Sequence, residues 1–121
     1  MVKNLLIVFA GGGLGAMFRL LGYVIIPSQS FPFATLFVNI IGSLFIGIIF
    51  GISLRHEYFS EEMKLFLATG ICGGFTTFSA FSVENLGMLQ HGKMAMAFLY
   101  VTASVLLALA ATWIGFRLGN G

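Results

Sequence analysis

Long apolar runs alternate with short polar connectors along this chain of 121 residues, and the pattern predicts four helices. A helix that crosses a membrane needs about 20 mostly apolar residues. Four runs reach that length: residues 4–26, 33–54, 65–83 and 94–116. Runs this long that do not alternate disfavour the strands of a β-barrel. We therefore expect an all-α fold, a single domain over residues 1–121 with four transmembrane helices.

Composition strengthens the membrane assignment. Hydrophobic residues make up 59% of the chain and charged residues only 8%, whereas soluble domains carry about 25% charged residues. The net charge of +2 is too small and too dispersed to suggest nucleic-acid binding. The single cysteine, Cys72, lies in an apolar run and is expected to pack as a small hydrophobe.

The N-terminal run follows Lys3 and contains small residues, as a cleavable signal peptide does. Because the apolar run continues as far as Pro27, we interpret it instead as a retained membrane helix. Four spans place both termini on one side, together with more of the basic residues than the other side holds. This mild bias favours cytoplasmic termini, and it is weak enough to permit insertion in both orientations.

Glycines recur four residues apart, so that both members of each pair lie on one helix face. Small residues in this arrangement allow helices to approach closely in lipid. The pairs are Gly11 and Gly15, Gly47 and Gly51, Gly70 and Gly74, and Gly115 and Gly119.

Polar residues interrupt the spans at few places. The stretch "GGFTTFSAFSVE" (73–84) brings glycines and hydroxyls into the third span and predicts a broken helix there. Thr35, Asn39 and Ser43 form an i, i+4, i+8 stripe on the second span. Arg19 lies in the first span, and Tyr100 and Ser104 lie four apart in the fourth.

Each of these groups also has a purely structural explanation. An asparagine can join two helices by a hydrogen bond, and an arginine near a helix end can extend to the membrane surface. Serine and threonine can bond to the carbonyl four residues back. Phenylalanines spaced by three, here Phe75, Phe78 and Phe81, can form a packing stripe.

Taken together, the groups favour an anion path. No carboxylate lies within the four runs, and the nearest is Glu84 at the expected end of the third. Amide, hydroxyl and guanidinium groups donate hydrogen bonds, and aromatic ring edges are electropositive. Backbone carbonyls freed at a helix break suit a small hard cation. The spans hold no catalytic Ser/His/Asp or Cys/His set, so we do not expect an enzyme.

Three stretches, "GGGLGAMFR" (11–19), "NIIGSLFIG" (39–47) and "GGFTTFSAFSVE" (73–84), resemble the signature motifs of the Fluc fluoride channels, also called CrcB proteins. The resemblance covers nearly the whole chain. It implies an antiparallel, dual-topology homodimer that exports fluoride passively across the bacterial plasma membrane. It also implies that the broken third helices of the two subunits cross at the centre.

The resemblance further implies roles for individual residues. A structural sodium ion would be held by the backbone carbonyls of Gly73 and Thr76. The fluoride pathway would use Asn39, Phe78, Phe81, Ser79, Arg19, Tyr100 and Ser104. The chain departs from the family pattern at Ala80, where threonine is usual, and at Leu20, where an aromatic is usual. One hydroxyl of the family's polar track is therefore missing.

Two other functions share the size and span count. A small dual-topology, proton-coupled exporter of organic cations would carry an acidic residue in its first span, but residues 4–26 contain none. A structural membrane subunit would use its polar groups only to join helices, and the clustering of Asn, Thr, Ser and Phe argues against it. Measurement of ion flux separates these alternatives.

Overall fold

The computed structural model describes residues 1–28 and 30–121, and the regular structure in them is entirely helical. The first two spans are α1 (Val2–Ile25) and α2 (Phe33–Arg55), and the fourth is α6 (Met94–Asn120). The third consists of α3 (Glu61–Lys64), the π-helix η1 (Leu65–Cys72), α4 (Gly73–Phe75) and α5 (Phe78–Gln90). All four spans are long and apolar enough to cross a membrane, as expected.

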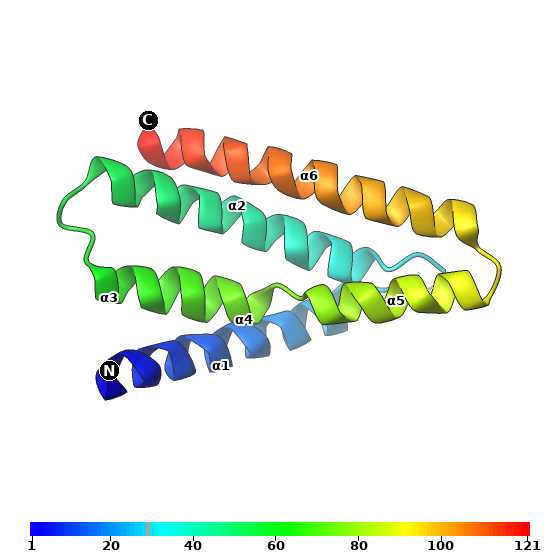
Figure 1. The fold of residues 1–121 in the computed structure, drawn as a ribbon, viewed down its shortest axis with the longest axis horizontal. Coiled ribbons are helices and arrows are strands. Elements are labelled where there is room, and N and C mark those ends of the chain that lie inside the picture. Colours follow the sequence, from blue (N-terminus) through cyan, green and yellow to red (C-terminus); the bar gives the residue numbers. More distant parts are fainter. Residues whose placement is uncertain (29) are drawn as a thin grey trace.

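The spans lie roughly parallel to one another in an elongated bundle (Figure 1). Helix α2 packs mainly against α6, whereas α1 packs against η1 and α4. Helix α5 continues the line of α4 after a short break and lies along α6. The N- and C-termini lie at the same end of the bundle, as the even number of spans predicts.

Glycines form the closest contacts in both helix pairs. A Cβ added to Gly11 on α1 would lie 2.9 Å from the Cα of Gly70 on η1. In the second pair, a Cβ added to Gly119 of α6 would overlap the carbonyl oxygen of Ile48 on α2. The prediction that the paired glycines allow close helix approach is confirmed.

The third span is longer than the predicted 65–83, and the residues expected to form the connector 84–93 are mostly helical. At the start, the Ser60 hydroxyl accepts a hydrogen bond from the Met63 amide at 3.1 Å and caps the first turn. At the end, Gly92 adopts a positive φ of 73°, which allows the chain to turn toward α6. The prediction was wrong because apolarity marks membrane depth, whereas capping residues mark where a helix begins and ends.

The π-helix is also absent from the prediction, which expected a break but no change of helix type before it. The amide of Gly73 donates to the carbonyl of Ala68, five residues back. Short π-helical segments occur mostly inside α-helices and often beside functional sites. Here the π-helix directly precedes the break.

Candidate functional site

The break in the third span consists of two residues in extended conformation. Thr76 has φ −81° and ψ 157°, and Thr77 has φ −148° and ψ 119°. Helix α4 therefore ends at Phe75, and α5 begins anew at Phe78. Extended backbone inside an apolar span leaves polar groups without helical partners, and these groups must be satisfied in another way.

Asn39 of α2 forms hydrogen bonds with both the amide and the carbonyl of Thr77. Its Oδ1 accepts a hydrogen bond from the Thr77 amide at 2.8 Å, and its Nδ2 donates to the Thr77 carbonyl at 3.1 Å. An amide NH₂ group carries two hydrogens, so one remains for a further acceptor. Asn39 thus fixes the break and keeps a donor.

Thr77 starts the next helix. Its Oγ1 accepts from the amide of Ala80 at 3.1 Å, as an N-cap does, and lies 3.3 Å from the hydroxyl of Ser79. Because Ala80 bonds to this side chain, its amide does not serve the carbonyl of Thr76, four residues earlier. Likewise the Thr77 amide, bonded to Asn39, does not serve the carbonyl of Gly73.

The two amides that bond to side chains leave free the two carbonyls that the family resemblance assigns to sodium. In a continuous α-helix, the carbonyls of Gly73 and Thr76 would accept from the amides four residues on. Carbonyl oxygens released from helical bonds are suitable ligands for a small hard cation. The two carbonyl oxygens at the break therefore fit as ligands of a sodium ion.

A cleft of about 370 Å³ lies beside the break. Six of the nine predicted site residues line it: Asn39, Gly73, Thr76, Phe78, Phe81 and Ser104. The remaining lining residues are Gly42, Ser43, Ile46, Cys72, Thr77, Val105 and Ala108. None of these lining residues carries a carboxylate. The cleft therefore combines hydrogen-bond donors and aromatic rings in an otherwise apolar surface.

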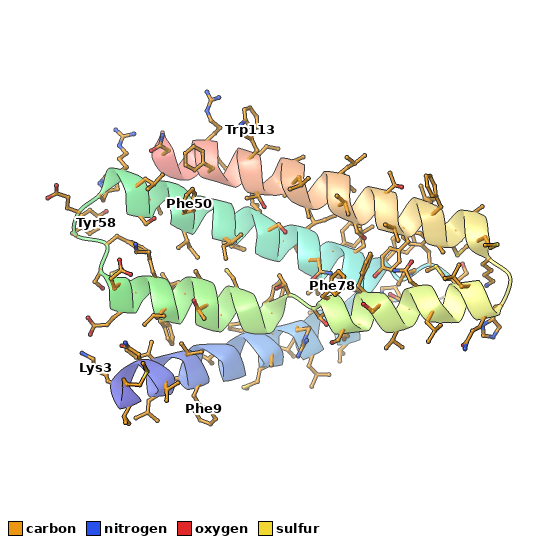
Figure 2. The ribbon with its side chains drawn as sticks, in the orientation of Figure 1. Lys3, Phe9, Phe50, Tyr58, Phe78 and Trp113 are labelled. Carbon is orange, nitrogen blue, oxygen red and sulfur yellow. The ribbon has the colours of Figure 1, made fainter. Side chains whose placement is uncertain are left out.

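Two of the lining side chains are available to a ligand, one as a hydrogen-bonding hydroxyl and one as an exposed ring. The Ser104 hydroxyl is buried and, within the described part of the chain, has no hydrogen-bond partner. The Phe78 ring is 77% exposed, and its centroid lies 5.4 Å from that of Phe81. Figure 2 shows Phe78 at the start of α5, where the break ends. The cleft is thus open on one side of a single chain.

Three predicted site residues lie outside the cleft lining. Tyr100 is fully buried and donates to Glu84 Oε1 at 2.7 Å. Ser79 is exposed beside the break. Arg19 is half-buried on α1, one helical turn beyond Gly15, at which an added Cβ would lie 2.8 Å from the Phe75 amide. Arg19 therefore lies at about the depth of the break, outside the residues that line the cleft.

Glu84 differs most from its expected position. It lies inside α5 and not at the end of a helix. Its Oε2 accepts from the hydroxyl of Thr35 at 2.7 Å, and that hydroxyl lies 3.1 Å from the hydroxyl of Tyr23. Sequence reasoning placed Thr35 in a polar stripe without pairing it with Glu84, and it assigned no role to Glu84 or Tyr23. The available signals were that Thr35 heads the Thr35–Asn39–Ser43 stripe and that Tyr23 lies one turn after Arg19.

Comparison with known proteins gives consistent matches. The family model described as "CrcB-like protein, Camphor Resistance (CrcB)" matches residues 6–116. The "Fluoride-specific ion channel FluC" of Flavobacterium psychrophilum is 45% identical over 117 residues, which cover 94% of each chain. The protein of the same name from Pyrococcus abyssi is 40% identical over 120 residues, which cover 98% of each chain.

A third relative, "Fluoride-specific ion channel FluC" of Thermus thermophilus, is 44% identical over 122 residues, covering 98% of this chain and 97% of its own. The matched region extends across all four apolar helices, and the relatives are named as ion channels, so the chain is a multi-pass protein of the bacterial plasma membrane and not an enzyme. With a family model matching 6–116 and relatives similar along nearly their whole length, the chain belongs to the CrcB family.

Proposed function

We propose that this chain forms a fluoride-selective channel that passively exports fluoride from the cytoplasm. The observation that carries the proposal is the cleft at the helix break, lined by amide, hydroxyl and phenyl groups and by no carboxylate. Its relatives are named as fluoride-specific ion channels, which gives the anion. The buried acid that a proton-coupled cation exporter needs is missing from this lining.

The pathway follows from the chemistry of the ion. Fluoride is small and strongly hydrated, so a pore must replace its water with close hydrogen-bond donors. The free N–H of Asn39 and the unused hydroxyl of Ser104 are such donors, and the edges of Phe78 and Phe81 add electropositive contacts. Arg19, Ser79 and Tyr100 complete the proposed pathway outside the cleft itself.

Export then needs no energy source beyond the membrane potential. Hydrogen fluoride is a weak acid that enters cells uncharged and ionises in the cytoplasm. An inside-negative potential favours the outward movement of anions by about 2.3 kcal/mol per charge per 100 mV. A selective passive path is therefore sufficient to lower cytoplasmic fluoride.

The working unit that we propose is an antiparallel homodimer. The cleft of one chain is open, with Phe78 largely exposed and Gly73 exposed beside it, so a second copy is needed to enclose an ion path. The mild charge bias is compatible with both orientations. A sodium ion held by the carbonyls of Gly73 and Thr76 would join the two breaks at the centre.

The first test is anion efflux from proteoliposomes. Vesicles loaded with potassium fluoride and treated with valinomycin should release fluoride rapidly, while vesicles loaded with chloride should not. Release of neither anion from well-incorporated protein would contradict the channel proposal. Proton-coupled uptake of an organic cation would then be measured in the same vesicles.

The residue assignment is tested by Phe78→Ile. This ring is largely exposed beside Phe81, so its loss should reduce fluoride efflux at least about tenfold and leave folding intact. Phe9→Ile is the matched control, since Phe9 is 79% exposed on α1, away from the break (Figure 2). Equal efflux from the two variants, with dimers verified by cross-linking, would remove Phe78 from the pathway.

A further inference from the structure

A continuous chain of hydrogen bonds joins four helices behind the cleft. It runs from Tyr23 on α1 to Thr35 on α2, then to Glu84 on α5 and finally to Tyr100 on α6. The three oxygen–oxygen distances along it are 3.1, 2.7 and 2.7 Å. Thr35 and Tyr100 are both fully buried. Such a chain connects the first helix to a part of the bundle that it otherwise barely touches.

The direction of each bond follows from counting hydrogens. A threonine hydroxyl has one hydrogen, and that of Thr35 is donated to Glu84 Oε2. The hydroxyl of Tyr23 must therefore be the donor in its contact with Thr35. Tyr100 donates to the other carboxylate oxygen, Oε1. Every hydroxyl hydrogen in the chain thus points toward Glu84.

The last residue in this series of hydrogen bonds, Tyr100, packs against the lining of the cleft. The Tyr100 ring has its centroid 4.9 Å from that of Phe81, and Phe81 lines the cleft. Glu84 also lies three residues after Phe81, on the same face of α5. The hydrogen bond to the carboxylate therefore restrains the Tyr100 ring, and the Tyr100 ring packs against the Phe81 ring.

We propose that Tyr23 is a positioning residue for the ion path: by donating to Thr35 it fixes Glu84 and Tyr100, and through them the Phe81 ring. The inference rests on the proposed function, because it assigns to Phe81 a place in the fluoride pathway. Tyr23 itself is not among the residues that line the cleft.

Removing the Tyr23 hydroxyl leaves Thr35 without the donor that restricts its rotation. A hydroxyl buried at this depth has no water with which to replace the bond. The loss of one such bond corresponds to about a fivefold change in an equilibrium or rate. We therefore expect Tyr23→Phe to lower fluoride efflux about fivefold. Thr35→Ser should keep most of the efflux, since it retains the hydroxyl.

The experiment is a double-mutant cycle of fluoride efflux from proteoliposomes. It compares wild type, Tyr23→Phe, Thr35→Val and the double variant, with Tyr58→Phe as the matched control on the exposed connector. If Tyr23 acts through Thr35, the fivefold loss disappears in the Thr35→Val background, because the acceptor is already gone. A residue that only packs α1 against its neighbours would give the same loss in both backgrounds.

The outcomes separate this inference from the proposed function. An active wild type with unchanged efflux in Tyr23→Phe, or with equal losses in the two backgrounds, would overturn the role of Tyr23 and leave the channel standing. A wild type without fluoride efflux would overturn both. Size-exclusion profiles of all variants, compared with that of Tyr58→Phe, show whether a lower efflux comes from misfolded protein.

Discussion

The two halves of the third span are held in place by different interactions. Before the break, η1 and α4 lie backbone to backbone against α1, with Gly70 against Gly11 and Gly74 against Gly12. After the break, α5 is held by side-chain hydrogen bonds, at Thr77 by Asn39 and at Glu84 by Thr35. Close glycine packing therefore distinguishes the first half, whereas the second half adds side-chain hydrogen bonds to the apolar packing of Met88 against α2 and α6.

The difference has a physical reason. In lipid, apolar surface gains little from contact between helices, so close packing of small residues provides much of the association energy. Such contacts orient no polar group and are suited to holding helices together. Hydrogen bonds orient individual donors, and they suit the half that borders the cleft. We therefore expect substitutions before the break to affect folding and substitutions at or after it to affect flux.

The largest effect should come from Gly15→Leu, on the packed side. A Cβ at this position would overlap the carbonyl oxygen of Ile71 and lie 2.8 Å from the amide of Phe75. Both are backbone atoms and cannot move aside alone, so α1 must separate from η1 and α4. We expect no monodisperse protein after extraction in detergent, as measured by size-exclusion chromatography.

Gly13→Leu is the matched control for this prediction. It lies two residues away on the same helix, and an added Cβ there meets nothing within 4 Å. Its size-exclusion profile should match that of the wild type. If both leucine variants fold equally well, the glycine contacts do not fix the first half of the span.

A smaller loss of fold and a large loss of flux should follow from Asn39→Asp, at the junction of the two halves. The aspartate keeps an oxygen for the Thr77 amide but loses the donor to the Thr77 carbonyl and the N–H left for an anion. It also adds negative charge to a cleft that we propose conducts fluoride. Fluoride efflux from proteoliposomes should fall at least about 30-fold, while the size-exclusion profile stays that of the wild type.

Asn120→Asp makes the same chemical change at an exposed position at the end of α6 and should leave efflux within about twofold of the wild type. Comparable efflux from the two aspartate variants would show that the amide of Asn39 only joins helices. That result would return Asn39 to the structural explanation that its sequence position also permits.

The half of the third span before the break, η1 and α4, was the more predictable from sequence. Glycine spacing depends only on helical periodicity, so Gly11, Gly15, Gly70 and Gly74 could be assigned to contacts before any partner was known. The break was also predictable, since two glycines and a run of hydroxyls oppose a continuous helix. The exact position of the break, at Thr76 and Thr77, could not be predicted, because five of the residues from 73 to 79 are glycine, threonine or serine.

The polar half could be predicted only in part. Glu84 was placed at the end of a helix because charge normally marks a membrane surface, yet it lies inside α5 with two hydroxyl donors. Those donors come from helices distant in sequence, 49 residues away for Thr35 and 16 for Tyr100. No local pattern encodes such pairing. The bond from the Tyr100 hydroxyl to Glu84 was therefore not predicted, and the place of Tyr100 in the fluoride pathway stays a prediction.

The smallest effect should come from the cap that starts the second half. Thr77→Ala removes the oxygen that accepts from the Ala80 amide at 3.1 Å, and the loss of an N-cap costs about 1 kcal/mol. Thermal unfolding in detergent should show this modest loss, and Thr77→Ser, which keeps the oxygen, should restore stability. Because Asn39 bonds to the Thr77 backbone and not to its side chain, the break itself should persist in both variants. If Thr77→Ala instead unfolds like Gly15→Leu, α5 depends on its cap as strongly as α1 depends on its glycines, and the contrast between the two halves fails.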